Sequence, residues 1–458
     1  MTDHLRDSDA ALERLKLLHP KKIDLSLGRI ERLLDSLGRP QDRLPPVIHV
    51  AGTNGKGSTV AVLRAIAEAA GMRAHAYTSP HLVRFVERIR LAGELIAEPH
   101  LVRFVERIRL AGELITEPHL AEILDRVEQA NAGQPITFFE ITAVAGFVAF
   151  AETPADVCIL EVGLGGEFDA TNVIETCKVA AIAPVDFDHA EFLGTDIRVI
   201  AAAKAGIIKP GRPVVSARQR EEAQEVIEAR AEALGAPLQI MGRDFDAYAQ
   251  AGRMVFQGED RLLDLPAPSL AGAHQVENAG LAVAAALAFG GPMAEEAAIA
   301  IGVSSAVWPA RLQHLTKGPY GEKAAARGSD LWLDGTHNPH GARALSAALQ
   351  AMAARDGRPV ALVVGILGNK NAAGMFEAFK PLHPTVYTVP SPSEAGSAPE
   401  ALAEAARSVG LPAQAHDTVM SGFEAALAQD GPPPHVIICG SLYLAGEVLA
   451  ASPETWPK

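Results

Sequence analysis

A short apolar segment that runs into a glycine-rich loop with one lysine constrains this chain more than any other feature. Residues 47–59 read Val-Ile-His-Val-Ala-Gly-Thr-Asn-Gly-Lys-Gly-Ser-Thr. We expect a buried strand over Val47–Ala51, a loop over Gly52–Ser58 and a helix over Thr59–Ala70. Glycines let backbone N–H groups turn inward around phosphate oxygens, while the lysine and the helix N-terminus add positive charge. The segment therefore predicts a nucleotide phosphate site, although its spacing differs from the common G-x-x-x-x-G-K-[ST] loop.

The composition is that of an ordinary globular protein, and it limits the partners that the chain can bind. Hydrophobic residues make up 48% of the 458 positions, charged residues make up 21%, and the formal net charge is −14. Nucleic acids and anionic membranes would be repelled at long range, so we expect neither as a partner, whereas a basic pocket can still bind a small anion. The three cysteines, Cys158, Cys177 and Cys439, are far apart, and no apolar run resembles a signal peptide or a membrane span. A reducing cytoplasm fits these observations.

Strand-like and helix-like segments alternate along most of the chain, which predicts an α/β fold with a largely parallel sheet. At 458 residues the chain exceeds what one core supports, so more than one domain is expected. The alternation breaks near residue 305 and restarts at Leu331-Trp-Leu-Asp. We therefore predict a P-loop-type ATPase domain over residues 1–304 and a smaller Rossmann-like α/β domain over residues 305–458. Examples of the predicted elements are strands over 157–162, 179–185 and 360–366 and helices over 197–206 and 278–289.

A near-identical tandem duplication occupies residues 81–118. Residues 81–99 read HLVRFVERIRLAGELIAEP, and residues 100–118 repeat them with Thr116 in place of Ala97 as the single difference. Two copies are too few to close the core of a repeat protein. We expect one copy's worth of chain to fill its place in an otherwise complete fold. The remaining residues, about nineteen, would form a surface excursion, because loop closure entropy grows slowly with length.

Several polar residues stand alone in apolar surroundings, where a buried charge needs a partner or a ligand. Two of them lie at the end of a predicted strand, where α/β proteins place their ligands. Because magnesium prefers oxygen ligands and bridges nucleotide phosphates, the set predicts a magnesium–nucleotide site. These residues are Ser79, Glu140, Glu161, Asp169, His189 and Lys204.

A series of short motifs runs along most of the chain. In order, they are Gly-Thr-Asn-Gly-Lys-Gly-Ser, Thr-Ser-Pro-His-Leu, Glu-Val-Gly-Leu-Gly-Gly, Lys-Ala-Gly-Ile, Asp-Gly-Thr-His-Asn-Pro and Gly-Ser-Leu-Tyr-Leu. Together they closely resemble the motifs of the folylpolyglutamate synthases, including the bacterial bifunctional dihydrofolate synthases, within the Mur ligase superfamily. The resemblance extends from about Leu25 to Leu444.

The resemblance implies a role for each matched position. Ser79, Glu140 and His189 would ligate magnesium. Lys204 would be carbamylated and would then bind a second magnesium as a carboxylate, and its apolar setting favours the neutral amine that reacts with carbon dioxide. His337 would help to position the incoming glutamate. The implied ATP-binding residues are Gly52, Thr53, Asn54, Gly55, Lys56, Gly57, Ser58, Asn278, Arg311 and Asp334, and the implied catalytic residues are Lys56, Lys204 and His337.

A few positions depart from the family pattern. Glu167 stands where arginine is usual, Ala203 replaces a glutamate, Thr336 replaces an alanine, and Asn369-Lys370-Asn371 stands where Asp-Lys-Asp is common. None of these changes removes an implied metal or phosphate ligand. They bear on substrate preference more than on the reaction.

The implied reaction is the formation of an amide by acyl activation. The γ-phosphoryl group of ATP would move to a substrate carboxylate, and the amine of L-glutamate would then displace phosphate. The implied acceptors are dihydropteroate and tetrahydrofolate, and the implied working form is a monomer with ATP and magnesium. Two alternatives stay open, namely a Mur-type ligase that acts on a cell-wall precursor and a nucleotide-driven switch that performs no ligation.

Overall fold

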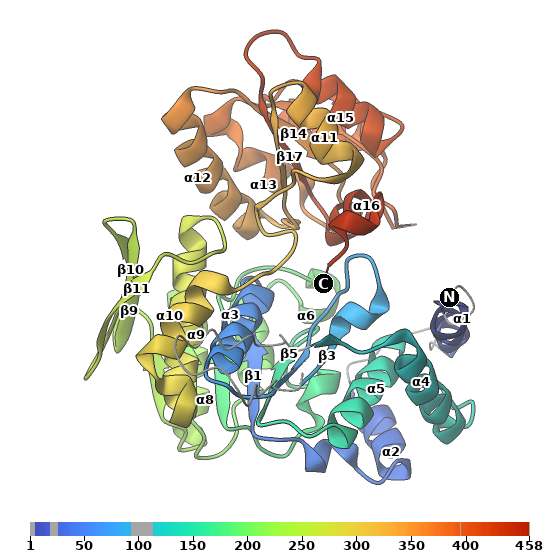
Figure 1. Ribbon diagram of the computed structural model, residues 1–458, viewed down its shortest axis with the longest axis vertical. Coiled ribbons are helices and arrows are strands. Elements are labelled where there is room, and N and C mark those ends of the chain that lie inside the picture. The colour runs from blue at the N-terminus through green and yellow to red at the C-terminus, as the bar shows by residue number, and fades with distance from the viewer. Residues whose placement is uncertain (1–4, 19–25, 93–112, 394, 458) are drawn as a thin grey trace, which may run out of the picture.

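The computed structural model describes residues 5–18, 26–92, 113–393 and 395–457 and places two α/β bodies one above the other (Figure 1). The chain from its blue N-terminal end to the yellow segments builds the larger, lower body, and the orange to red segments build the upper one. Each body contains its own mainly parallel sheet, which confirms the predicted α/β class. Among the described residues, no helix is both long enough and apolar enough to cross a membrane.

The larger body is built on an eight-stranded sheet in the order β4-β3-β2-β5-β1-β6-β7-β8. The strands from β2 to β8 in this order are parallel, and β3 and β4 form an antiparallel edge. Since β1 lies between β5 and β6, the loop that follows β1 opens near the middle of the sheet's carboxyl edge, where parallel sheets bind ligands. The strands are β1 (Val47–Ala51), β2 (Ala74–Tyr77), β3 (Ile89–Leu91), β4 (Glu113–Leu114), β5 (Val157–Glu161), β6 (Val179–Ile182), β7 (Val214–Ser216) and β8 (Leu238–Ile240).

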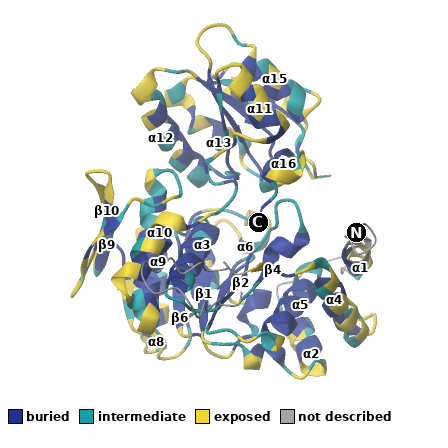
Figure 2. Ribbon diagram, viewed as in Figure 1, coloured by how far each residue is buried: buried dark blue, intermediate teal, exposed yellow. Residues whose placement is uncertain are grey.

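Helices cover both faces of this sheet. Alternate residues of β1 enter different cores, because side chains alternate across a strand: Ile48 and Val50 join one core, and Val47 and Ala51 join the other. Figure 2 shows buried strands between helices whose outer faces are exposed. The helices are α1 (Leu5–Lys16), α2 (Gly28–Ser36), α3 (Lys56–Ala69), α4 (Glu117–Asn131), α5 (Phe138–Glu152), α6 (Ala190–Leu193), α7 (Ile197–Ala205), α8 (Glu221–Ala233), α9 (Ala273–Phe289) and α10 (Glu296–Ser305).

A small antiparallel sheet and the upper body complete the fold. The small sheet contains β9 (Phe245–Gln250), β10 (Arg253–Gly258) and β11 (Leu262–Pro266), and it packs beside α9. The sheet of the upper body has the order β12-β13-β17-β14-β15-β16, parallel except for β12. Its elements are β12 (Gln313–His314), α11 (Gly318–Ala326), β13 (Asp330–Leu333), α12 (Pro339–Asp356), β14 (Val360–Val364), α13 (Ala372–Glu377), β15 (Thr385–Thr388), α14 (Pro399–Ser408), β16 (Ala413–Ala415), α15 (Val419–Leu427), β17 (His435–Cys439) and α16 (Leu442–Ala450).

The chain passes from the lower body to the upper one between the end of α10 and the start of β12. The division into residues 1–304 and 305–458 stays a prediction, and this crossing lies close to it. Two residues of the crossing, Ala310 and Leu312, have φ angles of 54° and 45°. A non-glycine residue rarely adopts this left-handed region, so the crossing is held by surrounding contacts.

The predicted strand after residue 46 and the predicted helix after it are present, but the helix begins earlier than expected. α3 starts at Lys56 rather than at Thr59, because Gly55, with φ of 88°, makes the turn that lets the helix begin. Lys56, Gly57 and Ser58 therefore belong to the first helical turn, where backbone N–H groups lack helical acceptors. This arrangement strengthens the expected anion site.

The described ends of the duplication join as one copy. Residues 81–92 of the first copy supply β3, and residues 113–118 of the second copy supply β4 and the start of α4. β3 and β4 pair directly, with Leu91 opposite Glu113. The two described pieces together provide nearly one whole copy of the repeated sequence, as expected. The rest of the duplication, including Leu101, Phe104 and Ile108, lies outside the described residues.

Candidate active site

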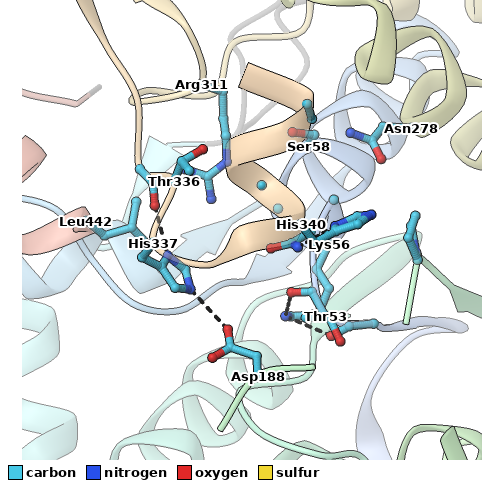
Figure 3. A pocket seen from close by; sticks show the side chains of 18 of the residues that line it. Thr53, Lys56, Ser58, Asp188, Asn278, Arg311, Thr336, His337, His340 and Leu442 are labelled. Atoms are coloured by element: carbon cyan, nitrogen blue, oxygen red, sulfur yellow. Dashed lines mark hydrogen bonds and ion pairs between the residues drawn. The ribbon is translucent and has the colours of Figure 1, made fainter. Parts of the chain in front are cut away.

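A cavity of about 390 Å³ lies where the two bodies meet, at the carboxyl edge of the larger sheet (Figure 3). The glycine-rich loop, the end of β5, α7 and α9 line it from the lower body, and the segments around Arg311 and His337 line it from the upper side. Of the residues that the sequence singled out, the cavity brings together Gly52, Thr53, Asn54, Gly55, Lys56, Gly57, Ser58, Ser79, Glu161, His189, Lys204, Asn278, Arg311, Asp334 and His337.

The glycines of the loop are required by close neighbours. A Cβ atom on Gly55 would lie 2.3 Å from Oδ1 of Asn278, and one on Gly57 would lie 2.6 Å from Nε1 of Trp308. A Cβ atom on Gly52 would lie 2.7 Å from that of Ala183. The loop is therefore clamped between β6 and α9, with its backbone exposed to the cavity.

Two lysines, the half-buried Lys56 and the buried Lys204, converge on the same carbonyl group. Nζ of Lys56 donates to the backbone oxygens of Gly52 (3.0 Å) and Thr53 (3.2 Å), and Nζ of Lys204 donates to Gly52 (3.0 Å). Burial lowers the pKa of Lys56, and burial followed by the charge of Lys56 lowers the pKa of Lys204 to about 7. Lys204 is therefore largely a neutral amine slightly above neutral pH, the form that carbamylation requires.

Several side-chain oxygens at the cavity have few or no protein partners and are suited to bind a metal ion or a phosphate ligand. Oγ of Ser58 is buried and has no hydrogen-bond partner among the described residues. Glu161 ends β5 with its carboxylate buried, and burial raises its pKa while the charge of Lys56 opposes that rise. It accepts a long bond of 3.3 Å from the backbone N–H of Ser79. Within the described ranges, no three His, Cys, Asp or Glu side chains form a metal cluster by themselves, so phosphate and hydroxyl oxygens would have to complete a magnesium shell.

The structure does not bring Glu140 to this cavity. Glu140 lies in the first turn of α5, where Oε2 accepts from the backbone N–H of Thr137 at 2.7 Å in a capping box. Arg29 binds the same carboxylate through two bonds of 3.0 Å. Its charge is therefore already balanced. Glu140 lines a neighbouring cavity instead, and the carboxylate at this cavity is that of Glu161.

Asp334 is more a structural anchor than an open ligand site. Its Oδ2 accepts from the backbone N–H of Leu312 at 2.7 Å, and its Oδ1 accepts from the N–H and hydroxyl of Thr336. It thus holds the left-handed crossing in place, and Thr336 contributes a bond that alanine could not make. Arg311, which lies between Ala310 and Leu312 in the crossing, also lines the cavity.

Asp188 is the centre of a polar network that the sequence reasoning missed. Its buried carboxylate binds Nζ of Lys370 (2.5 Å), Nδ2 of Asn338 (3.0 Å) and Nε2 of His337 (3.2 Å), all from the upper body. Burial opposes ionisation of Asp188, but His337, His189 and Lys370 outweigh it and hold its pKa well below the usual range. The signal was available in part, because Asp188 directly precedes His189 and Asn338 lies with His337 in the Asp-Gly-Thr-His-Asn-Pro motif.

The phosphate loop also contacts the upper body. Asn54 and Asn338 exchange two side-chain bonds of 3.1 Å each, and Nδ2 of Asn54 lies 2.6 Å from Nδ1 of His340. His189 faces this region from the N-terminus of α6, and burial lowers its pKa to about 4, so that its ring is neutral at physiological pH. The two bodies therefore meet through the residues that line the cavity.

A second cavity of about 420 Å³ adjoins the first and is mainly apolar and aromatic. Phe139, Phe168, Phe192 and Tyr443 line it, and Phe168 and Tyr443 are 49% and 48% exposed. A flat, partly apolar molecule suits such a lining. The residues shared by both cavities are Ser79, Pro80, Gly163, Leu164, His189, His337 and Leu442.

The fold and the site together define a class of protein. A phosphate loop at the centre of a parallel sheet, a buried lysine of low pKa and a second α/β body that closes over the cavity are the features of a two-domain, nucleotide-dependent ligase. In agreement, the family model described as "Mur ligase, glutamate ligase domain" matches residues 322–442.

Comparison with individual proteins narrows the class. The chain is 34% identical to the folylpolyglutamate synthase of Lacticaseibacillus casei, over 92% of each chain. It is 32% identical to the dihydrofolate synthase/folylpolyglutamate synthase of Escherichia coli strain K12, over 96% of this chain and 94% of the other. Escherichia coli FolC in complex with DHPP and ADP superposes with a TM-score of 0.83 at 31% identity, over 96% of each chain. A bifunctional folylpolyglutamate synthase/dihydrofolate synthase with Mn, AMPPNP and L-glutamate bound gives a TM-score of 0.81 at 31% identity, over 97% of each chain.

This chain belongs to the folylpolyglutamate synthase/dihydrofolate synthase family. It is an ATP-dependent ligase, and ATP and a divalent metal ion are its cofactors.

Proposed function

We propose that the chain joins the amine of L-glutamate to a carboxylate of dihydropteroate, of tetrahydrofolate, or of both. The observation that carries the proposal is the shared wall between the two cavities. An acceptor whose flat ring system lies among the aromatic residues of the second cavity can extend its carboxylate past Ser79 and His337 into the first. The γ-phosphate of ATP, held by the loop, would lie on the other side of that wall.

The chemistry assigned to the site is acyl activation. A carboxylate reacts poorly with an amine because its leaving group would be an oxide. Transfer of the γ-phosphoryl group to the carboxylate oxygen forms an acyl phosphate, and the amine then attacks the carbonyl carbon and releases phosphate and one proton. Lys56 and Arg311 neutralise the phosphates, and enclosure between the two bodies keeps water from the intermediate.

The metal-binding roles remain proposals. Ser79, Glu161 and His189 would hold one ion beside the phosphates, with Glu161 in the place first assigned to Glu140. When bound, the ion neutralises charge on the transferring phosphoryl group. Ser58 supplies a further free hydroxyl to the same region.

Lys204 would hold a second ion after carbamylation. Its neutral amine attacks carbon dioxide, an N–C bond forms, and the ammonium proton of the adduct leaves to water, so that a cation is replaced by a carboxylate. Only the uncharged amine is a nucleophile, and the low pKa of Lys204 supports this assignment. Asn278 and Arg311 are proposed to contact ATP, and His337 is proposed to position glutamate.

The test is glutamate-dependent release of phosphate from ATP. Dihydropteroate, tetrahydrofolate and a cell-wall peptide precursor are offered separately, and the products are resolved by mass. A product heavier by one glutamate residue with either pterin acceptor supports the proposal. Activity with the cell-wall precursor alone, or ATP binding without any ligation, would overturn it in favour of the corresponding alternative.

We further propose that the enzyme works as a cytoplasmic monomer. The three cysteines are buried and free, which suits a reducing compartment. Both walls of the site come from one chain, so catalysis needs no second copy. Analytical ultracentrifugation of the active enzyme would show a species of about 48 kDa.

A further inference from the structure

A buried chain of hydrogen bonds connects the phosphate-loop strand to the wall between the two cavities. It begins at His49 in β1, passes through Thr171 in the short 3-10 helix Ala170–Val173, and ends at Asp169. All three side chains are at most 3% exposed. Asp169 was expected at the magnesium–nucleotide site, but it lines only the second cavity, and His49 and Thr171 line neither cavity.

The direction of these bonds is fixed by counting hydrogens. Oγ1 of Thr171 lies 2.6 Å from Oδ1 of Asp169 and 2.9 Å from Nε2 of His49. A carboxylate can only accept, so the single hydroxyl hydrogen goes to Asp169, and the hydroxyl oxygen must accept from His49. Burial, followed by the charge of Lys209, lowers the pKa of His49 to about 3, so its ring is neutral and carries its one hydrogen on Nε2. Nδ1 of His49 has no partner among the described residues, which agrees with an unprotonated nitrogen.

Asp169 in turn holds the wall. Its Oδ1 also accepts from the backbone N–H of Thr171 at 2.9 Å, and its Oδ2 accepts from the backbone N–H of Leu164 at 2.8 Å. Leu164 belongs to the segment Gly163–Gly166, and Gly163 and Leu164 line both cavities. Asp169 therefore holds the backbone N–H of Leu164, and its own side chain also lines the second cavity.

The segment has little freedom to move without disturbing the site. A Cβ atom on Gly163 would lie 2.3 Å from the ring of Phe139 in the apolar cavity. A Cβ atom on Gly166 would lie 2.6 Å from the carbonyl oxygen of Ala203 and 3.0 Å from Cα of Lys204. The backbone of the segment is thus packed against the acceptor side at one end and against α7 at the other.

We propose that His49 and Thr171 are positioning residues for the acceptor, which act through Asp169 on the wall Gly163–Gly166. The inference rests on the proposed function for the identity of the acceptor. His49 orients the Thr171 hydroxyl, Thr171 fixes the Asp169 carboxylate, and Asp169 fixes the backbone against which the acceptor lies. Among the described residues, the loop at Gly52–Ser58 makes no hydrogen bond to His49, Thr171 or Asp169, so we expect its nucleotide contacts to be less affected than the acceptor side.

The test compares Thr171→Val, which keeps the shape but removes the hydroxyl, with Thr171→Ser, which keeps it. We expect Thr171→Val to raise the KM for the pterin acceptor about tenfold and to leave the Kd for ADP within about twofold of the wild-type value. We expect Thr171→Ser to behave almost as the wild type. Unchanged acceptor kinetics in Thr171→Val, or an equal loss for acceptor and ADP, would overturn the proposal. Unchanged acceptor kinetics would mean that the Thr171 hydroxyl has no part in positioning the acceptor. An equal loss for acceptor and ADP would mean that the substitution loosens the whole site.

A double-mutant cycle tests whether His49 acts through Thr171. His49→Leu should raise the acceptor KM by a similar factor, and the double variant should be no worse than Thr171→Val alone. If the increases in acceptor KM of the two single variants multiply in the double variant, His49 does not act through Thr171, and the proposal is refuted. His49→Leu also serves as an independent route to the same loss if Thr171→Val does not fold.

Amide hydrogen exchange provides a readout that needs no substrate. Exchange at Leu164 should be faster in Thr171→Val than in the wild type, because its acceptor Asp169 is no longer fixed. Unchanged exchange would overturn the proposal whatever the enzyme's substrate. An inactive wild type would count against the proposed function instead, so the two failures are distinguishable.

Discussion

Removal of one copy of the duplicated segment can be done in two ways that differ by one side chain. Deletion of residues 93–111 leaves Thr116 before α4, whereas deletion of residues 100–118 leaves Ala97 at the same place, and the two products are otherwise identical. Thr116 is the N-cap of α4, with Oγ1 accepting from the backbone N–H of His119 at 3.4 Å. The pair of deletions therefore separates the effect of the surplus copy on the free energy of unfolding from the effect of the helix cap.

Both deletions should fold and keep their activity, because β3 and β4 are already paired and need only a short connection. Shortening the connection from about twenty residues to a tight turn removes about three doublings of loop length, worth roughly 2 kcal/mol of free energy of unfolding. An N-cap threonine replaced by alanine costs about 1 kcal/mol, and the long bond here points to the lower part of the range of roughly 0.5–2 kcal/mol. The first deletion should thus be the most stable protein, and the second should lie between it and the wild type.

Urea unfolding followed by circular dichroism gives the order of stabilities, and the phosphate-release assay shows that the site is intact. Thr116→Ala in the full-length chain is the matched control, since it should lose the same free energy as separates the two deletions. If the deletion of residues 93–111 fails to fold, the second copy is an integral part of the core. If both deletions have the same midpoint, the cap contributes nothing.

Three further changes test the site. Lys56→Ala should reduce turnover by at least about 10³-fold without changing the urea midpoint, because the loop loses its one side-chain cation; near-normal activity in the folded variant would refute the ATP site. Lys204→Ala should be inactive, and short carboxylates such as acetate should partly restore its activity. Wild-type activity should fall below about pH 7 as the amine becomes protonated. Carbamylation would be contradicted if wild-type activity did not depend on bicarbonate and the variant were not rescued. His49 has a folded pKa of about 3 against about 6.5 unfolded, so the unfolded chain binds more protons between these values and stability is lost as the pH falls through this window, by about 2 kcal/mol at pH 5. His49→Gln should therefore show a shallower loss of stability between pH 6.5 and 4 than the wild type, and parallel curves would show that His49 does not titrate in this way.

The sequence predicted the part of the site that is local along the chain. The strand, the glycine-rich turn and the lysine of the phosphate loop lie within thirteen consecutive residues, and local rules of backbone geometry sufficed to relate them. Even there, the start of α3 was placed three residues late, because the left-handed turn at Gly55 cannot be told from the other glycines by composition.

The parts that sequence reasoning missed depend on pairs that are distant along the chain. Glu140 and Glu161 both appeared as lone acids, and only the fold shows that Arg29, far upstream, neutralises Glu140 and leaves Glu161 at the cavity. Asp188 and Lys370 are likewise separated by 182 positions. Periodicity can show that a charge is buried, but it cannot show which of several distant charges lies beside it.

The ion pair between Asp188 and Lys370 has a consequence for how ligand binding would be measured. Because the loop bonds to Asn338 and His340 of the upper body, the form that encloses the nucleotide is the form in which the two bodies are together. The apparent affinity for ADP is then the intrinsic affinity multiplied by the fraction of molecules in that arrangement. A change at Lys370 would be recorded as weaker nucleotide binding even if the loop itself were untouched. The measured ADP affinity of this enzyme would therefore also report the fraction of molecules in which the two bodies are in contact.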